Sequence, residues 1–238
     1  MTELIRINKY IADQGWASRR EADQLIIDGK ILVNGKKAVL GLKITEKDKV
    51  ELKGNVKERV YLAYYKGRGI ITHSPGEGET DIAMRLKKDY SLTNVSPVGR
   101  LDKDSEGLII LSNDGRVTGP LLNPEEAHEK EYEVHVDKKI KSSFLKEMAK
   151  GVDIEGYKTK KAKVAQPSKN PDSLSFHITL TEGKKHQIRR MCAALGYQIQ
   201  GLKRVRIENI ELGKLKPNQY RKIANDELKE FLKILNIK

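Results

Sequence analysis

The chain has 238 residues, a formal net charge of +13, and 38% apolar against 33% charged residues. Its length and composition predict a globular protein of one or two domains with a heavily charged surface. No apolar run approaches the roughly 18 residues of a membrane span, and the N-terminus lacks the apolar core of a signal peptide. The single cysteine, Cys192, excludes an internal disulfide and a cysteine-based zinc cluster. We therefore expect a cytoplasmic protein.

The positive charge is concentrated in one part of the sequence. Residues 1–55 contain 11 basic and 8 acidic residues, whereas residues 158–222 contain 16 basic and four acidic residues. This clustering favours a polyanionic partner, because each phosphate that is neutralised releases condensed counterions. A lysine-rich solvated face would explain the charge equally well. The aromatic fraction of 5% argues against an extended stacking platform for single-stranded nucleic acid.

Residues 5–52 have the pattern of a small separate unit with the order helix, helix, strand, turn, strand. Ser18 and Glu21 have the spacing of a capping box, which predicts the start of the second helix. The apolar run at 31–33 predicts a strand, and Asn34-Gly35 predicts a tight hairpin turn after it.

This string resembles the S4 RNA-binding module. The resemblance implies a small α/β fold that contacts the phosphates and the shape of structured RNA rather than its base edges. Ordinary surface charge remains the alternative for any single basic residue of the segment. The candidate RNA contacts are Arg6, Lys9, Arg19, Arg20 and Lys36.

The polar, turn-rich segment 53–59 predicts a linker, so we expect an S4-like domain at residues 1–52 and a second domain at 60–238. In the second domain short apolar runs alternate with turns, and several runs have the period of two that is typical of strands. This mixture predicts an α+β fold with a largely antiparallel sheet. Strands are expected at 60–64, 108–111, 132–136, 174–180 and 207–212, and helices at about 79–89, 141–150, 185–195 and 225–235.

The stretch from Val98 to Gly115 is the most informative part of the second domain. Arg100 and Asp102 are two positions apart, and on an extended backbone such residues face the same side, so both are expected to enter one pocket. The apolar run 108–111 predicts a buried strand that would support the preceding loop. Taken alone, an aspartate in a loop is more often a turn or cap residue than a catalyst.

The whole stretch resembles the signature of the RsuA-type pseudouridine synthase family, in which a Gly-Arg-Leu-Asp segment carries the catalytic aspartate. The resemblance implies that a uridine in RNA is isomerised: the C1′–N1 bond breaks, the base rotates, and C5 is joined to C1′. It implies that Asp102 is a covalent nucleophile toward the base or the ribose. It also implies that no cofactor or metal is needed, and the sequence contains no phosphate-binding loop, dinucleotide fingerprint or Cys/His ligand set.

Lys130-Glu131-Tyr132 matches the family's second motif, a Lys-x-Tyr at the start of a strand. The resemblance implies that Tyr132 stacks on the target uracil and acts as the general base on the ribose, since its ring can hold a flat base and its hydroxyl can reach sugar atoms. Without the motif, a half-buried structural tyrosine would be the simpler interpretation. Lys130 is a candidate contact to the substrate.

The segment from Phe176 to Met191 resembles the family's third motif, a strand followed by a glycine turn and a basic helix. By position, Arg189 would pair with Asp102 and keep it ionised, because the guanidinium fork matches a carboxylate and stays charged. Arg190 follows about 100° further round the helix and would contact phosphate.

A uridine within folded RNA must leave its stack before Asp102 can reach it, which costs on the order of a few kcal/mol. The resemblance implies that Arg100 occupies the vacated space. Lys184 is a further candidate contact to RNA, and Leu180 is expected to form an aliphatic wall under the uracil. His186 is expected to have a structural or RNA-contacting role rather than to act as a general acid.

The sequence departs from the family at two places. Tyr65-Lys66-Gly67-Arg68-Gly69 has Gly67 where the family has proline, which predicts a more flexible turn. Ser105 replaces the usual threonine and retains its hydroxyl.

The resemblance covers nearly the whole chain and is greatest to the large-subunit pseudouridine synthases of the F type, on the strings 128–132, 187–192 and 226–228. We expect an isomerase that acts as a monomer on a uridine in structured rRNA, in the 23S molecule, with no membrane partner. The same chemistry on 16S rRNA or tRNA is one alternative. A non-catalytic RNA-binding or ribosome-assembly protein of the same fold is another, and the intact Asp102, Tyr132 and Arg189 argue against it.

Overall fold

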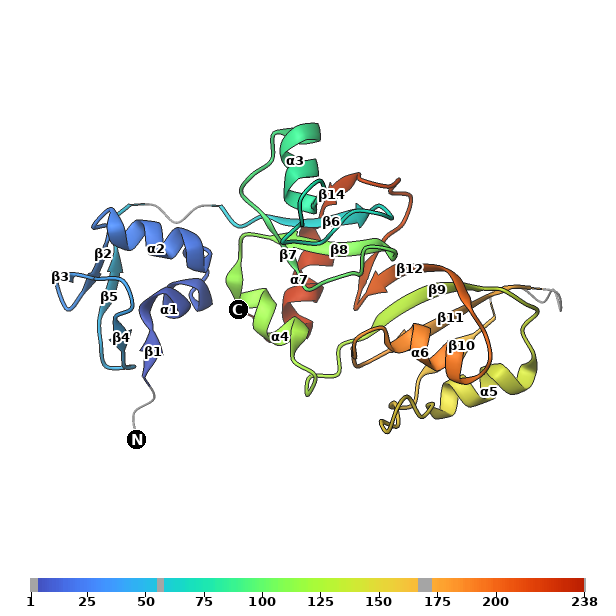
Figure 1. Ribbon diagram of the computed structural model, residues 1–238. Helices are drawn as coiled ribbons and strands as arrows, with labels where there is room; N and C mark the ends of the chain where they lie inside the picture. Colours follow the sequence, from blue (N-terminus) through green and yellow to red (C-terminus); the bar gives the residue numbers. More distant parts are fainter. Residues whose placement is uncertain (1–3, 55–57, 167–172, 238) are drawn as a thin grey trace.

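The computed structural model describes residues 4–54, 58–166 and 173–237 (Figure 1). Residues 55–57 of the predicted linker lie outside the described residues, as do residues 1–3 of the predicted first domain and residues 167–172 and 238 of the predicted second domain. In the described part of the chain, no helix is both long and apolar enough to cross a membrane.

The N-terminal part contains two helices and two small sheets (Figure 1). The Ser18 hydroxyl accepts from Glu21 N at 3.3 Å and the Glu21 carboxylate accepts from Ser18 N at 3.0 Å, which confirms the capping box. Asn34 and Gly35 have φ angles of 51° and 78°, which confirms the predicted hairpin turn. The elements are β1 (Ile5–Arg6), α1 (Ile7–Asp13), α2 (Arg19–Ile27), β2 (Ile31–Val33), β3 (Lys36–Lys37), β4 (Lys43–Ile44) and β5 (Val50–Leu52).

From β6 onward the described residues form one nine-stranded sheet. Its main path has the order β10-β11-β9-β12-β8-β6-β14, while β7 pairs with β8 and β13 with β12. The named strands pair antiparallel except β12 and β8, which run parallel, so the predicted α+β fold with a largely antiparallel sheet is confirmed. The strands are β6 (Tyr61–Lys66), β7 (Ser96–Val98), β8 (Glu106–Ser112), β9 (Lys130–Val136), β10 (Lys163–Ala165), β11 (Ser175–Leu180), β12 (Ile199–Ile207), β13 (Ile210–Glu211) and β14 (Tyr220–Lys222).

Helices cover both faces of this sheet (Figure 1). They are α3 (Ile82–Tyr90), the 3₁₀ helix η1 (Gly115–Val117), α4 (Thr118–Leu122), α5 (Ser142–Lys150), α6 (Gln187–Ala194) and α7 (Asn225–Ile234). On the face that carries Ile109 and Val134, α3 packs against β6 and β8, and α5 and α6 pack against β9 and β11. We call this the front face. On the back face, which carries Leu108 and Glu133, α4 and α7 cover β6 and β8.

One predicted strand is wrong, and strands β7, β10, β12 and β14 were not predicted. The apolar pattern at 207–212 is a hairpin rather than a strand, because β12 ends at Ile207, Glu208 turns with a φ of 48°, and β13 begins at Ile210. Ile207 and Ile210 are both buried in the same cluster, which gave the pattern its regular spacing. Strand β12 itself escaped prediction because basic side chains interrupt its apolar residues.

The two parts of the chain meet where α1 ends against η1. The buried Asp114 accepts hydrogen bonds from Arg116 and from the Tyr61 hydroxyl, and its Oδ2 lies 3.8 Å from Arg59 Nε. Burial alone would raise the pKa of Asp114, but the hydrogen bonds from Arg116 and Tyr61 outweigh it and hold the pKa below its usual value. A Cβ on Gly15 would lie 2.8 Å from Asp114 Oδ1, so the chain approaches closely here.

Candidate active site

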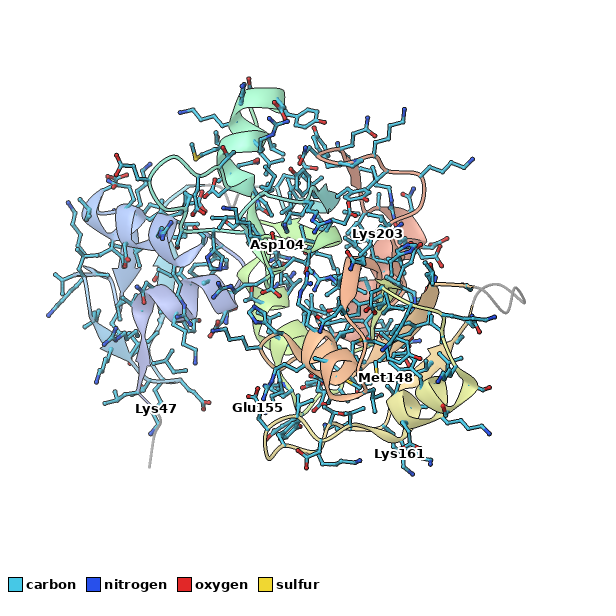
Figure 2. All side chains as sticks on the ribbon, turned by 45° about the vertical axis from the view of Figure 1, so that its right-hand side comes forward. Lys47, Asp104, Met148, Glu155, Lys161 and Lys203 are labelled. Carbon is cyan, nitrogen blue, oxygen red and sulfur yellow. The ribbon has the colours of Figure 1, made fainter. Side chains whose placement is uncertain are left out.

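Asp102 lies in the loop between β7 and β8, near the middle of the molecule, where Figure 2 labels the neighbouring Asp104. The buried Thr72 holds the loop: its hydroxyl donates to Leu101 O at 2.7 Å and accepts from Leu101 N at 3.0 Å. The Asp102 side chain itself is 48% exposed. The loop backbone is therefore anchored while the carboxylate stays accessible.

Arg100 is also exposed on this loop, which contains no strand between Gly99 and Ser105. The argument that Arg100 and Asp102 share one side of an extended strand therefore does not apply, and neither residue lines a described cavity. The predicted strand at 108–111 is confirmed as part of β8, all of it buried.

Lys66 lies under the loop and is fully buried. Its Nζ donates to three carbonyl oxygens, of Ile70 at 2.7 Å, Gly67 at 3.1 Å and Lys103 at 3.4 Å. Burial lowers the pKa of Lys66 to about 8, although the nearby carboxylate of Asp102 acts in the opposite direction. Lys66 thus ties the end of β6 to the residue that follows Asp102.

The glycine in place of proline at position 67 predicted a more flexible turn, but a hydrogen bond holds this turn in place. Gly67 N donates to Asn218 Oδ1 at 3.3 Å, a hydrogen bond that proline could not make. Ser105 is buried, and its N donates to Asp102 O at 3.1 Å.

A row of front-face residues crosses five strands in register: Lys66 of β6, Gly107 of β8, Arg204 of β12, Tyr132 of β9 and Ile178 of β11. We call these five residues the front-face row. In-register neighbours point to the same face of a sheet, so the row carries Lys66, Arg204 and Tyr132 side by side beneath the loop of Asp102.

Tyr132 is half-buried, and its hydroxyl has no hydrogen-bond partner in the described part of the chain. Lys130, two residues earlier and on the same face, donates to His128 O at 3.1 Å. Burial and, next, the charge of Arg204 lower the pKa of Lys130. Leu180 pairs with Lys130 and is buried in the apolar cluster under α6.

Helix α6 brings His186 rather than Arg189 to Asp102. His186 precedes the helix with a φ of 53°, and its Nε2 lies 3.7 Å from Asp102 Oδ2. Arg189 Nη2 instead donates to Asp104 O at 3.5 Å. The predicted ion pair of Arg189 with Asp102 is absent from the described residues. The left-handed turn at His186 places the imidazole ring of His186 against the carboxylate, whereas Arg189 follows almost one helical turn later and lies elsewhere.

A buried carboxylate fixes the start of α6. Glu182 accepts from Gln187 Nε2 at 2.7 Å, from Lys160 N at 2.9 Å and from the Tyr157 hydroxyl. Burial would raise the pKa of Glu182, but these hydrogen bonds lower it below its usual value. Sequence reasoning missed Glu182 and Gln187, although both belong to the third motif and carried the signal.

Two predicted RNA contacts have other partners. Arg190 donates to Ile154 O at 2.9 Å and to Glu155 Oε2 at 2.6 Å, so it holds the loop that Figure 2 marks with Glu155 instead of pointing freely to solvent. Lys184 Nζ lies 4.6 Å from the centre of the Tyr157 ring. Both side chains are therefore already engaged.

The predicted contacts of the N-terminal part are all exposed: Arg6, Lys9, Arg19, Arg20 and Lys36. None of them forms an ion pair with another residue that the structure describes. They are free to meet phosphate.

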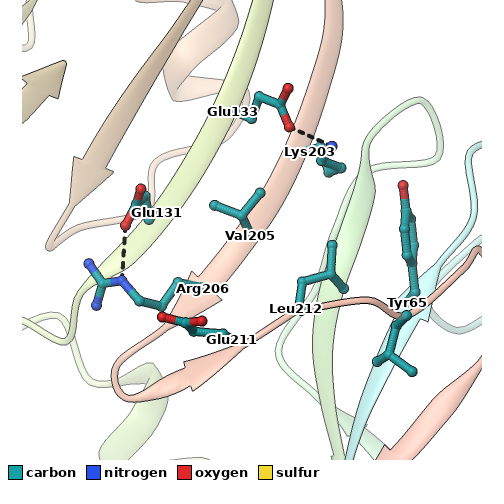
Figure 3. A pocket seen from close by; sticks show the side chains of 10 residues that line it. Tyr65, Glu131, Glu133, Lys203, Val205, Arg206, Glu211 and Leu212 are labelled. Carbon is teal, nitrogen blue, oxygen red and sulfur yellow. Dashed lines mark hydrogen bonds and ion pairs between the residues drawn. The ribbon is translucent and has the colours of Figure 1, made fainter. Parts of the chain in front are cut away.

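A cavity of about 350 Å³ lies on the back face of the sheet (Figure 3). Leu212 and Tyr65 line one side of it, and the pairs Glu131–Arg206 and Glu133–Lys203 line the other. It contains none of the predicted catalytic residues. The described residues also contain no group of three or more His, Cys, Asp or Glu side chains arranged for a metal ion.

Comparison with known proteins identifies both parts of the chain. The RNA pseudouridylate synthase family matches residues 60–194, and the S4 domain matches residues 5–50. The dual-specificity RNA pseudouridine synthase RluF of Escherichia coli strain K12 is 39% identical over 237 residues, covering 97% of this chain and 79% of that protein. The ribosomal large subunit pseudouridine synthase B of Bacillus subtilis strain 168 is 34% identical, covering 95% of each. A crystal structure of a pseudouridylate synthase superposes with a TM-score of 0.69 at 27% identity, covering 97% of this chain and 99% of that one.

Proposed function

The chain belongs to the RNA pseudouridylate synthase family, and from that membership we propose that it converts a uridine of structured 23S rRNA into pseudouridine with Asp102 as the nucleophile. One observation carries the proposal. Asp102 presents a half-exposed carboxylate on a loop whose backbone is held by Thr72 and Lys66, directly beside the front-face row.

The carboxylate has the properties that covalent catalysis needs. A nucleophile must be accessible, held in position and ionised. Lys66 and His186 supply the neighbouring positive or hydrogen-bonding groups, and attack on C6 of the base and on C1′ of the ribose both use the same oxygen atoms. Tyr132, with its free hydroxyl, stacks on the uracil and acts as the general base on the ribose.

Arg189 supports the nucleophile through the loop backbone. Its bond to Asp104 O joins α6 to the loop two residues after Asp102. Once RNA enters, a rotation of this long side chain brings its guanidinium to Asp102.

The uridine reaches Asp102 by flipping out of its stack. Arg100 is exposed on the same loop and is long enough to fill the space that the base leaves and to meet a phosphate. Its position at the rim of the loop, rather than beside Asp102 on a strand, suits insertion into RNA.

The N-terminal residues 1–52 hold the RNA, residues 53–59 link the two parts, and residues 60–238 carry the chemistry. The exposed basic side chains of α1, α2 and β3 support RNA binding, as does the basic segment 158–222. We also propose that the enzyme is a monomer and that it acts in the cytoplasm, where rRNA is available to it. The ribosomal name of the Bacillus subtilis relative favours rRNA over tRNA as the target.

The decisive experiment maps pseudouridine in rRNA and tRNA of cells that lack the gene, and then restores wild type, Asp102→Asn or Asp104→Asn. The amide introduced by Asp102→Asn keeps the shape of the side chain but is not a nucleophile, so this variant is expected to restore no modification. Asp104→Asn is the matched control, since Asp104 is exposed on the same loop and contributes its backbone oxygen to Arg189. If Asp102→Asn restored the modification, Asp102 would not be the nucleophile. If the pseudouridine lost from cells without the gene lay in 16S rRNA or tRNA, that RNA would be the target instead of 23S rRNA.

A further inference from the structure

Arg204 is the residue of the front-face row that no motif assigned. It is only 5% exposed, although it carries a charge that burial makes costly. It lies between Gly107 and Tyr132 in register, so its side chain belongs to the face that carries Tyr132. The charge therefore sits between the loop of the nucleophile and the tyrosine.

Gly107 makes room for Arg204. A Cβ at Gly107 would lie 2.3 Å from the Arg204 carbonyl oxygen, and Gly107 has a φ of 107°. No residue with a side chain fits a backbone approach this close. The chain thus brings β12 against β8 at the one place where Arg204 can reach the start of β8.

The guanidinium uses only part of its hydrogen-bonding capacity. Its Nε donates to Leu108 O at 2.7 Å, whereas neither terminal nitrogen has a partner among the residues that the structure describes. A guanidinium has five N–H donors in a fixed planar fork, and buried donors are normally paired. Four donors are therefore available to a ligand at this position.

Two further cations lie near Arg204. Lys66 and Lys130 both interact electrostatically with Arg204, while Lys66 also interacts with Asp102, Glu106 and Asp104 and Lys130 with Glu208. The three basic side chains donate only to backbone carbonyl oxygens. Glu106, at the start of β8, accepts from the Tyr65 hydroxyl at 2.8 Å on the back face. A hydrogen-bond acceptor that carries or gains negative charge suits these free donors.

We propose that Arg204 binds the uracil of the target nucleotide through O2 or O4 and stabilises the negative charge that develops on the base, an inference that rests on the proposed function. If Asp102 attacks C1′, an Oδ–C1′ bond forms, the C1′–N1 bond breaks, and its electron pair stays on N1 and spreads to O2 and O4. If Asp102 attacks C6, the electron pair of the C5–C6 bond moves toward O4. In both routes the C1′–N1 bond is exchanged for a C1′–C5 bond, and the bond between Asp102 and the substrate breaks again. C5 then loses a proton and N1 gains one, so no other reactant is consumed.

A backbone phosphate suits this position less well than the base. Arg204 lies at the level of the sheet in line with Tyr132, the proposed stacking partner of the uracil. Phosphates remain at the outside of folded RNA, where the exposed Arg100 and Lys185 can meet them. A flat base that leaves its stack can reach the sheet.

The test uses Arg204→Lys, which keeps the charge and can still reach Leu108 O but lacks the fork. Arg206→Lys is the matched control, because Arg206 belongs to the same strand but binds Glu131 on the back face. The substrate is a stem-loop RNA around the mapped uridine, with uridine, 2-thiouridine or 4-thiouridine at the target or with a methylphosphonate linkage 3′ to it. Single-turnover rates and RNA dissociation constants are measured for each combination, with thermal melting as the check of folding.

We expect Arg204→Lys to slow single turnover by about 10²-fold, as loss of an oxyanion donor does, with the dissociation constant changed by only a few-fold and Arg206→Lys near wild type. The penalty should shrink on one thio substrate, since sulfur is a weaker acceptor, and stay the same on the methylphosphonate. An unchanged rate overturns the proposal. So does a loss that lies in binding and disappears on the methylphosphonate, which would identify a phosphate contact.

Two controls keep the inference separate from its premise. If Arg204→Lys fails to fold, the wild-type rates decide: an equal rate on uridine and both thio substrates overturns the role of Arg204. If wild type forms no pseudouridine in any RNA, or Asp102→Asn remains active, the proposed function fails instead.

Discussion

The two faces of the central sheet are built from the same strands, but they differ in whether their basic side chains have carboxylate partners. On the back face, basic side chains of β12 meet carboxylates of β9: Arg206 Nε lies 2.9 Å from Glu131 Oε2, and Lys203 Nζ lies 2.5 Å from Glu133 Oε2. On the front face, Lys66, Lys130 and Arg204 donate only to backbone carbonyl oxygens, and none forms an ion pair with a described residue.

This is the difference that the proposed function predicts between a structural face and a reactive one. Cations that already have carboxylate partners offer little to a ligand, whereas buried cations without them lower the free energy of an anionic group placed beside them. The back face also holds the 350 Å³ cavity, which contains none of the residues proposed to take part in the reaction.

The largest contrast is expected between Tyr132 and its neighbour Glu133. Tyr132→Ala should reduce the single-turnover rate by about 10³-fold and Tyr132→Phe by about 10²-fold, because the phenylalanine ring still stacks but cannot transfer a proton. Glu133→Gln, on the back face, should leave the rate unchanged. Rapid-quench measurement of product with RNA in single turnover would check this, and equal losses at both positions would break the distinction between the faces.

The buried cation Lys66 predicts a pH effect on stability. Its pKa is about 8 in the folded chain against an ordinary 10.5, so between these values the unfolded chain holds the proton and the folded chain does not. The free energy of unfolding should therefore rise with pH in this window, by at most about 3 kcal/mol relative to Lys66→Met. Urea titrations from pH 7.5 to 10.5 measure it.

Lys103→Met is the control for that series, since Lys103 is an exposed lysine bound to Glu79. It should keep the same rise with pH as wild type. A Lys66→Met curve parallel to wild type would show that Lys66 has no lowered pKa.

The smallest effect is expected on the back face. Glu131→Gln removes one of two carboxylates around Arg206, which keeps Glu129 at 3.0 Å. Because the group is partly exposed, the free energy of unfolding should fall by no more than about 1 kcal/mol, and the catalytic rate should not change. A loss of rate without loss of stability would mean that the two faces act together.

The sequence predicts the elements that depend on neighbouring residues, but not the strands that form only by pairing with distant parts of the chain. The capping box at Ser18, the turn at Asn34-Gly35 and the helix after Gly183 each depend on neighbouring residues, and all are present. Strand β12 was missed because Lys203, Arg204 and Arg206 hide its apolar alternation. Their partners on β8 and β9 are about 70 to 100 residues away in the chain and become neighbours only in the sheet.

The candidate site shows the same limit. The motifs placed Asp102, Tyr132 and Arg189 near one another. The contact of His186 with Asp102, however, depends on a left-handed backbone, which is uncommon outside glycine and does not follow from the sequence pattern. Arg190 looked like a phosphate ligand by its helical position, yet the loop at Ile154 and Glu155 occupies it. Loop positions of this kind do not follow from periodicity.

The close approach of Gly15 to Asp114 places the end of α1 against the part of the chain that carries Asp102. With RNA held by α1 and α2 as proposed, a target uridine must lie at the distance from the bound RNA at which it can reach Asp102. The nucleotides between these two points can then vary freely. Selection by distance of this kind permits two unrelated RNAs to share one enzyme, provided that each folds to the same span.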